Sequence, residues 1–351
     1  MITISQFKSL IILLLMVSLE LKGSHGAAQV PCLFIFGDSL SDSGNNNPLL
    51  SWAKCNYLPY GIDFPGGATG RFCNGRTTID LVGDHLGLPN YIQPYANKTN
   101  KLYHEGVNYA SGSAGIKKET GLQVGQRICM DVQLQRHKEI IAKINKDMGA
   151  KATGHLKQCI YNIYVGSNDW MLNFFSGGSV IYLLNPISFG NSLIKDLTKQ
   201  ITTLYGMGAR KVVVFGLGPL GCLPPITPLG ICSPFANAVI EVWNNSLKTM
   251  VKQFNAKYKD ARFIWINSVK IITPDLKGLG LRVRTNSCCM VVGASCVPLS
   301  IPCPNRKDHA YWDFAHPTEA ANKVLAARAY KNQVATDTYP MDISALAALK
   351  L

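Results

Sequence analysis

A serine beside an expected strand end, and an aspartate and histidine near the carboxyl terminus, are the residues whose types and spacing suit chemistry. Ser39 follows the apolar run 34–36 and stands in the Gly- and Asn-rich stretch 37–47. Asp313 precedes His316 by three positions. A hydroxyl nucleophile needs a base to take its proton, and the base needs a carboxylate to orient it. The three residues therefore predict nucleophilic catalysis, in which Ser39 attacks, His316 is the base and Asp313 orients the imidazole.

Turn formation is a simpler explanation for Ser39, because Asp, Ser, Gly and Asn favour turns for backbone reasons. The pair near the carboxyl terminus argues for chemistry, since side chains three residues apart on one tight turn can face the same way. Asp38, beside the serine, is an alternative acid. Its position in the turn instead predicts that it accepts backbone hydrogen bonds and braces the corner.

Strand-like and helix-like segments alternate through almost the whole chain. Parallel strands need crossover connections, which are usually helical, so this alternation predicts an α/β fold with helices on both faces of a parallel sheet. Ligands bind outside the carboxyl ends of such strands, and Ser39 is expected there. Strands are expected at 32–36, 107–110, 159–165, 211–215 and 262–267, and helices at 48–54, 77–86, 124–147, 191–206, 236–258 and 320–330.

Three further stretches bear on a site. Residues 111–115 are small, which lets the backbone approach another group closely, as an oxyanion donor requires; a plain βα turn is the alternative. Residues 166–169 place polar side chains directly after the expected strand 159–165. Residues 55–75 are predicted to form an ordered surface loop, whose aromatic residues suit lipid or cell-wall esters: Tyr57, Tyr60 and Phe64.

Four sequence blocks carry a resemblance to a known family. They are Phe-Gly-Asp-Ser-Leu at 36–40, Gly-Val-Asn-Tyr-Ala-Ser-Gly at 106–112, Gly-Ser-Asn-Asp at 166–169 and Asp-Phe-Ala-His-Pro at 313–317. In these blocks and their order, nearly the whole mature chain resembles the plant GDSL-type esterase/lipases of the SGNH hydrolase superfamily. The resemblance implies a flavodoxin-like three-layer sandwich. It also implies a carboxylic ester hydrolase that uses an acyl-enzyme. Neither a metal nor a cofactor is expected, because this mechanism already supplies a nucleophile, a base and oxyanion donors.

The resemblance also implies the members of an oxyanion hole. These are the amide of Ser39, the amide of Gly112 and the side chain of Asn168, with Gly115 as the alternative source of the second amide. Ser113 stands where many relatives have glycine, which bears on the flexibility of this loop. Every catalytic position of the family is present, so an active enzyme is expected.

The amino terminus predicts secretion. Within residues 1–27, Lys8 precedes the apolar run 10–17 and small residues follow, which is typical of a cleaved signal peptide. The run is short for a bilayer-spanning helix, although a retained anchor is the alternative. Residues 28–351 are expected to form a single domain, and the protein is expected to be extracellular.

Charge narrows the choice of partner. The formal net charge of +14 falls by one with the signal, which removes two lysines and one glutamate. The lysines of the chain are dispersed, and the sequence contains no Arg-rich stripe, so nucleic acid is not an expected partner. The expected substrate is an acyl-ester small molecule or a lipid. The protein is expected to be a monomer and to contact lipid or acidic cell-wall surfaces peripherally.

Disulfides are expected for most of the 11 cysteines, because a secreted protein meets an oxidising environment. An odd number leaves one unpaired. Cys222 and Cys232 bracket one stapled loop, and the four cysteines within 288–303 staple another. Zinc is the alternative for that second group, although it lacks paired CxxC spacing and interleaved histidines. Cys32 is expected to be buried in the first strand.

Sequons predict two N-glycosylation acceptors. Asn97 lies in a polar stretch, and Asn244 lies in an expected helix.

Two alternative functions remain open from the sequence. An extracellular acyltransferase would use the same triad with an alcohol in place of water. A secreted binding or defence protein would keep the fold without using its chemistry.

Overall fold

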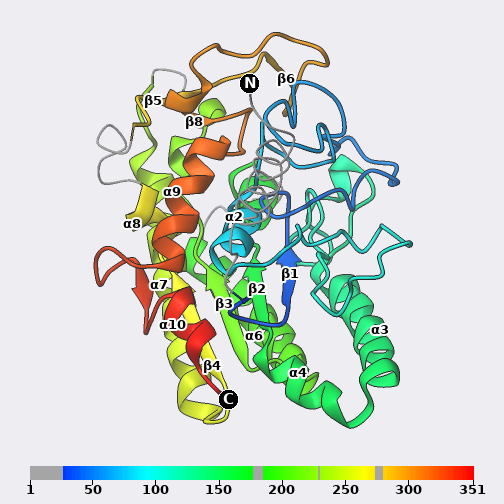
Figure 1. Ribbon diagram of the computed structural model, residues 1–351. Coiled ribbons are helices and arrows are strands. Elements are labelled where there is room, and N and C mark those ends of the chain that lie inside the picture. The colour runs from blue at the N-terminus through cyan, green and yellow to red at the C-terminus, as the bar shows by residue number, and fades with distance from the viewer. Residues whose placement is uncertain (1–26, 177–184, 228–229, 273–279) are drawn as a thin grey trace, which may run out of the picture.

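A five-stranded sheet lies at the centre of the protein (Figure 1). The computed structural model describes residues 27–176, 185–227, 230–272 and 280–351. The strand order is β1-β2-β3-β4-β9; the first four strands are parallel, and β9 is antiparallel to β4. The strands of this sheet are β1 (Leu33–Gly37), β2 (Ile160–Tyr164), β3 (Lys211–Phe215), β4 (Arg262–Ile266) and β9 (Thr338–Tyr339).

Helices cover both faces of the sheet, because alternate apolar residues of each strand point to opposite sides. One face packs against α3, α4, α6 and α7, and the other against α2, α8, α9 and α10. The helices are α2 (Thr78–His85), α3 (Met130–Met148), α4 (Ala152–Gln158), α6 (Pro186–Gly206), α7 (Pro234–Lys257), α8 (Ser268–Ile272), α9 (Glu319–Tyr330) and α10 (Ile343–Ala348). The three-layer α/β sandwich confirms the predicted fold class.

Side-chain caps set where several helices begin. Thr77 and Asp80 form a capping box at α2, in which each side chain accepts the other residue's backbone N–H. Thr318 caps α9 by accepting the N–H of Ala321. This cap starts α9 directly after the loop that contains His316, so it also fixes one end of that loop.

Short elements form the loops at the carboxyl end of the sheet, where β5, β6 and β8 lie at the top of Figure 1. β5 pairs in parallel with β8, and β6 and β7 form an antiparallel hairpin. These strands are β5 (Val283–Ser287), β6 (Val291–Val292), β7 (Ser295–Cys296) and β8 (His309–Tyr311). The short helical turns are η1 (Leu122–Val124), η2 (Gly149–Lys151), the π-helix η3 (Asp169–Phe175), η4 (Leu220–Cys222), η5 (Pro224–Ile226) and η6 (Arg306–Asp308).

The expected helix at 48–54 is wrong. Its backbone instead bonds across to a second loop: the N–H of Trp52 donates to the carbonyl of Val124, and Gln126 donates to the carbonyl of Leu50. Leu50 and Trp52 are 79% and 86% exposed, so a helix here would gain no stabilisation from core contacts of these side chains. The helix expected from residue 124 begins only at Met130, after these loop contacts.

The strand expected at 107–110 is only partly regular. The N–H of Ile35 donates to the carbonyl of Val107, and the N–H of Tyr109 donates to the carbonyl of Ile35, so the segment lies along β1. Asn108 then directs its side chain to the carbonyl of Ser41. The segment therefore ties the sheet edge to the turn that contains Ser39.

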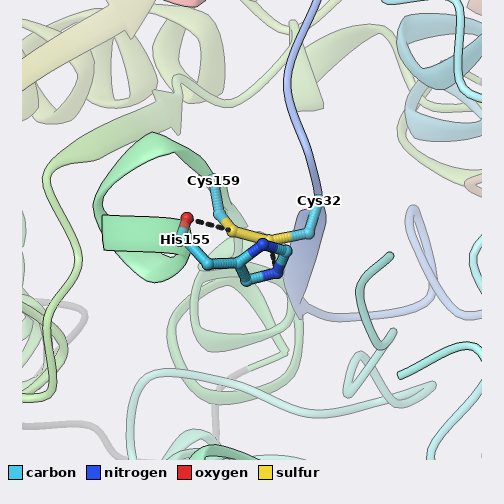
Figure 2. A group of neighbouring side chains, drawn as sticks. All are labelled: Cys32, His155 and Cys159. Atoms are coloured by element: carbon cyan, nitrogen blue, oxygen red, sulfur yellow. Dashed lines mark hydrogen bonds between the residues drawn. A yellow bond between two sulfur atoms is a disulfide. The ribbon is translucent and has the colours of Figure 1, made fainter. Parts of the chain in front are cut away.

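The described residues contain four disulfides, and both loops for which disulfides were predicted, 222–232 and 288–303, are cross-linked. Cys222 bonds to Cys232, while the crowded group pairs as Cys288–Cys303 and Cys289–Cys296. The cysteines of that group are therefore not thiolates that hold zinc. Cys32 is buried as expected, but it is not a free thiol: it bonds to Cys159 beside His155 and joins β1 to the start of β2 (Figure 2).

The remaining cysteines are free and buried. They are Cys55, Cys73 and Cys129, which makes three unpaired thiols where the odd count required one. The predicted signal segment 1–27 lies outside the described residues, apart from Ala27. Within the described part of the chain, none of the helices has the length and hydropathy needed to cross a membrane.

Candidate active site

Ser39 lies on a turn that is fixed by the contacts of Gly37, two residues before it. Gly37 ends β1 with φ +151°, and a Cβ there would lie 2.1 Å from the carbonyl oxygen of Tyr164, so only glycine permits this approach to β2. The Gln133 side chain on α3 accepts the N–H of Gly37 and donates to its carbonyl, at 2.9 and 2.8 Å. No sequence signal pointed to Gln133.

Asp38 braces the same turn. Its carboxylate accepts the N–H of Leu40, and its carbonyl accepts the N–H groups of Ser41 and Asp42. Burial raises the pKa of Asp38 to about 7, although the Leu40 hydrogen bond and the charge of His316 act to lower it. These contacts match the bracing that its position in the turn predicted.

The structure brings Ser39 and the distant pair Asp313 and His316 into one hydrogen-bonded chain. His316 Nε2 lies 2.7 Å from Ser39 Oγ, and His316 Nδ1 lies 2.9 Å from both carboxylate oxygens of Asp313. Because a carboxylate only accepts, Nδ1 carries the proton and Nε2 is left to accept from the serine. This arrangement can withdraw the Ser39 proton.

Asp313 is buried yet held as a carboxylate. Burial raises its pKa, but the charge of His316 and hydrogen bonds from His316, Tyr60 and the amide of Ala315 outweigh burial, and the net pKa is lowered. Tyr60 was expected on a surface loop and is instead fully buried, with its hydroxyl 2.6 Å from Asp313 Oδ2. No local pattern in the sequence reveals this contact.

Asn168 lies shortly after β2, directly before η3, and lines the same region as Ser39 and His316. One amide hydrogen of its side chain donates to the carbonyl of Ala114 at 2.9 Å. A side-chain amide has two hydrogens, so the second remains for a ligand. Asn168, Ser39 and His316 line one groove.

The expected donor Gly112 does not face this groove. Its amide donates to the buried carboxylate of Asp42 at 3.0 Å, and a Cβ there would lie 2.5 Å from the Phe72 ring. Gly115 lies against Thr120 and the carboxylate of Asp169. The Gly112 amide is therefore already bonded to Asp42, which contradicts its assignment as the second donor, and the Gly115 alternative stays a prediction.

Ser113, which follows Gly112, presents a backbone amide at the groove. It lines the groove with Ser39 and Asn168, and among the described residues its amide and the Ser39 amide have no hydrogen-bond acceptor. Its φ of +63° lies in the left-handed region that glycine adopts most easily. Ser113 is therefore held in a backbone conformation that glycine adopts with less strain.

Two cavities meet at Ser39 and His316. The inner pocket, of about 70 Å³, is largely apolar and lies between the start of α9 and η4, with Leu220, Leu223 and Leu325 among its walls. The outer groove, of about 810 Å³, opens beside Trp52 and the β6–β7 hairpin. An ester bound with its carbonyl at Ser39 would extend into both.

Burial separates the two predicted glycosylation sites. Asn97 is exposed, and its carboxamide oxygen accepts the Thr99 hydroxyl. Asn244 is 3% exposed, donates to the carbonyl of Leu217 and accepts the amide of the same residue. A glycan on its nitrogen has no room in this fold, so the expectation for Asn244 is wrong.

Comparisons with known proteins identify the family. The model of the GDSL-like lipase/acylhydrolase family matches residues 33–329, so the chain belongs to this family and is a carboxylic ester hydrolase. It is 41% identical over 354 residues to GDSL esterase/lipase At1g29670 of Arabidopsis thaliana, in an alignment that covers 97% of each chain. It is 42% identical over 340 residues to GDSL esterase/lipase At1g29660 of the same plant, which covers 92% of each chain.

Proposed function

We propose that this protein is a secreted hydrolase that cleaves acyl esters through an acyl-enzyme on Ser39. The observation that carries the proposal is the unbroken hydrogen-bonded chain from Ser39 through His316 to Asp313, with distances of 2.7 and 2.9 Å. Four disulfides support an oxidising destination. In this proposal residues 1–27 are a signal peptide, and 28–351 are one enzymatic domain.

In the first half-reaction, Ser39 Oγ attacks the ester carbonyl carbon while His316 Nε2 takes its proton. The carbonyl oxygen becomes an oxyanion, which accepts hydrogen bonds from the amides of Ser39 and Ser113 and from the Asn168 side chain. Donors already aimed at this position stabilise the developing charge without reorganising. Asp313 stabilises the imidazolium. Collapse of the intermediate breaks the ester bond, and His316 gives its proton to the departing alcohol.

In the second half-reaction, water replaces the alcohol in the outer groove. His316 takes a proton from the water as it attacks the acyl carbon, and the second oxyanion uses the same donors. Collapse returns the proton to Ser39 Oγ and releases the carboxylic acid. The enzyme returns to its starting state, so no cofactor is consumed.

The cavities indicate how an ester lies. The inner pocket is apolar but small, so it takes an acyl chain of a few carbons, and the larger part of the substrate lies in the outer groove. Longer chains require the inner pocket to open.

An apolar rim lies beside the groove, which Trp52 and Val292 line, and it supports contact with lipid surfaces. Its residues come from loops that lie against one another: 50–52 bonds to 124–126, and the N–H of Leu299 donates to the carbonyl of Leu58. Exposed apolar side chains gathered at one site favour association with an apolar phase. The rim consists of Leu50, Trp52, Leu122, Val292 and Leu299, which are between 61% and 86% exposed.

The test is hydrolysis of p-nitrophenyl acetate, butyrate and palmitate by the mature protein, alongside folded Ser39→Ala and His316→Ala variants. Both variants should lose at least about a thousandfold in kcat, and butyrate should exceed palmitate in kcat/KM. Retention of activity by Ser39→Ala overturns the proposal. An inactive wild type that labels stoichiometrically with a fluorophosphonate at Ser39 indicates an acyltransferase, and one that does not label indicates a binding protein.

A further inference from the structure

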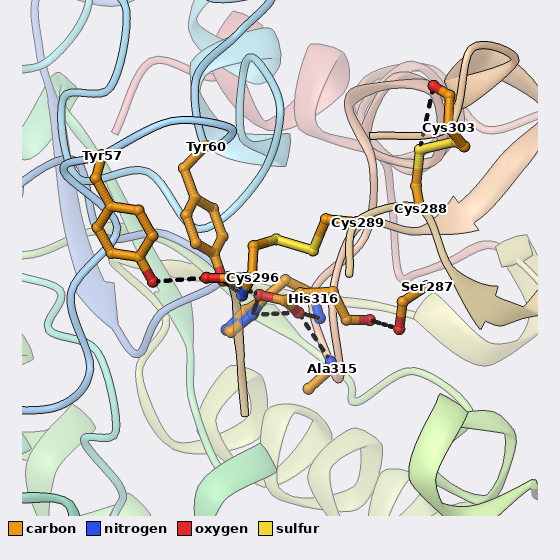
Figure 3. Close-up of a disulfide and its surroundings, with 10 residues drawn as sticks. Tyr57, Tyr60, Ser287, Cys288, Cys289, Cys296, Cys303, Ala315 and His316 are labelled. Atoms are coloured by element: carbon orange, nitrogen blue, oxygen red, sulfur yellow. Dashed lines mark hydrogen bonds and ion pairs between the residues drawn. A yellow bond between two sulfur atoms is a disulfide. The ribbon is translucent and has the colours of Figure 1, made fainter. Parts of the chain in front are cut away.

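Tyr60 contributes a fourth side chain to the hydrogen-bonded chain described above. It comes from the loop after the first sequence block, 253 positions before Asp313, and its side chain is fully buried. Its hydroxyl lies 2.6 Å from Asp313 Oδ2 and 3.1 Å from the backbone nitrogen of Cys296 (Figure 3). The loop that contains Tyr60 and the segment that contains Cys296 therefore meet at the Tyr60 hydroxyl oxygen, next to the carboxylate of Asp313.

The neighbours of the Tyr60 hydroxyl determine where its single proton points. The Cys296 amide only donates, so the tyrosine oxygen accepts from it. The carboxylate of Asp313 only accepts, so the hydroxyl proton must point to Oδ2. The other oxygen, Oδ1, accepts the amides of Ala315 and His316. The carboxylate is thus held from both sides while it contacts the imidazole.

The β6–β7 hairpin holds the Cys296 amide in place. The Cys289–Cys296 disulfide closes this short hairpin, and the N–H of Cys289 donates to the carbonyl of Trp312, next to Asp313. Figure 3 shows the disulfide beside both Tyr60 and His316. A neighbouring ring also packs here: Tyr57 makes an edge contact with Tyr60, with centroids 5.4 Å apart, and donates to the carbonyl of Cys296 at 3.1 Å.

We infer that Tyr60 is a positioning residue for the reaction: its hydroxyl, oriented by the disulfide-closed hairpin, holds Asp313 at the angle and in the ionised form that His316 needs. This inference rests on the proposed function, since it assumes that His316 acts as the base for Ser39. Tyr60 itself touches neither the serine nor the outer groove, so it acts only through Asp313.

Removal of the hydroxyl has a defined electrostatic consequence. The Tyr60 hydrogen bond is one of the interactions that lower the pKa of Asp313 against the effect of burial. Without it the carboxylate keeps more of its negative charge for the imidazolium, so the coupled pair of Asp313 and His316 binds protons more tightly. Neutral His316 is the form that accepts the serine proton, and so the acid limb of the kcat/KM profile moves to higher pH.

Other titratable groups near this network do not produce the same signature. Burial raises the pKa of the Cys55 thiol well above its usual value, and it raises the pKa of Tyr57, so both stay protonated through the neutral range. Burial also raises the pKa of Asp38 to about 7, and its carboxyl interacts electrostatically with His316. All three residues are unchanged in a Tyr60 variant, so a difference between the two profiles reports the lost hydroxyl.

The experiment compares Tyr60→Phe with the wild type over a range of pH, using p-nitrophenyl butyrate. Phenylalanine keeps the ring packing and removes only the oxygen. A hydrogen bond to a charged group justifies an expected loss of about tenfold or more in kcat, with KM within about twofold. The acid limb should move to higher pH. The matched control is Tyr161→Phe, because the Tyr161 hydroxyl is also buried but donates to the carbonyl of Leu156, at the other end of the sheet.

A second readout does not depend on turnover. The rate of Ser39 labelling by a fluorophosphonate, followed against pH, should show the same displacement in Tyr60→Phe. A Cys289→Ser/Cys296→Ser variant should displace the limb in the same direction, because the hairpin then holds the Cys296 amide less firmly. Superimposable profiles for wild type and folded Tyr60→Phe overturn the inference while Ser39 dependence still stands. A wild type that neither hydrolyses esters nor labels at Ser39 overturns the proposed function instead.

Discussion

Replacing Asn168 with alanine tests the oxyanion donors directly. One of its two amide hydrogens is already committed to Ala114 at 2.9 Å, which fixes the carboxamide plane and leaves the other hydrogen for the groove. Alanine removes that one donor and changes neither Ser39 nor His316. Loss of a single side-chain donor to an oxyanion costs about 10²–10³ in kcat, or roughly 3–4 kcal/mol of transition-state stabilisation. We expect a loss of this size with little change in KM, because the ground-state carbonyl carries less charge.

Stability must be separated from catalysis in this test. Asn168→Ala also leaves the buried carbonyl of Ala114 without its donor, which costs about 1–3 kcal/mol of folding free energy. Asn255→Ala is the matched control: the Asn255 side chain makes two hydrogen bonds to the backbone of Phe263, near the amino end of β4 and away from the groove. The control should lose comparable stability in urea unfolding and retain its kcat.

The assay is steady-state hydrolysis of p-nitrophenyl butyrate, with urea unfolding of each variant. A kcat for Asn168→Ala within about threefold of the wild type would refute the assignment, since that corresponds to less than about 1 kcal/mol. A change confined to KM would refute it as well, because it would show uniform binding of ground and transition states.

Two further predictions concern the loops around the groove. Ser113→Gly keeps the backbone amide and relieves a left-handed serine, so kcat should stay within about twofold and stability should not fall, whereas Gly112→Ala meets the Phe72 ring and should lower stability in urea unfolding. Leu122→Ser/Leu299→Ser removes two exposed apolar side chains of the rim, so cosedimentation with phospholipid vesicles should weaken severalfold while hydrolysis of soluble butyrate is retained. Unchanged sedimentation would count against a lipid-facing rim.

Local patterns in the sequence were sufficient for the main elements of the fold. β3 coincides with the expected strand 211–215, and α9 begins one residue before the expected helix 320–330. β3 is a short, largely apolar run that is buried throughout, and α9 begins at the side-chain cap of Thr318, so the packing of each agrees with its local preference. Residues 48–54 failed because their apolar side chains face outward, and only the tertiary structure shows that the chain pairs there with 124–126 instead.

The glycosylation sites show the same division. A sequon is a local pattern, and it is equally good at Asn97 and Asn244. Their exposure differs with their place in the fold: Asn97 lies in an exposed loop, whereas Asn244 lies on the buried face of α7.

The sequence by itself determined which residues could be a nucleophile, a base and an orienting carboxylate, and it also determined the geometry of Asp313 and His316. Those two residues share one turn, so three-residue spacing is enough to bring their side chains together. Only the tertiary structure decided what else reaches the site. Ser39 meets His316 across 277 positions, Tyr60 meets Asp313 across 253, and the Gly112 amide donates to Asp42 instead of facing the groove. Each of these contacts depends on how separate segments pack, and a hydrogen bond between distant segments leaves no periodic mark in the sequence.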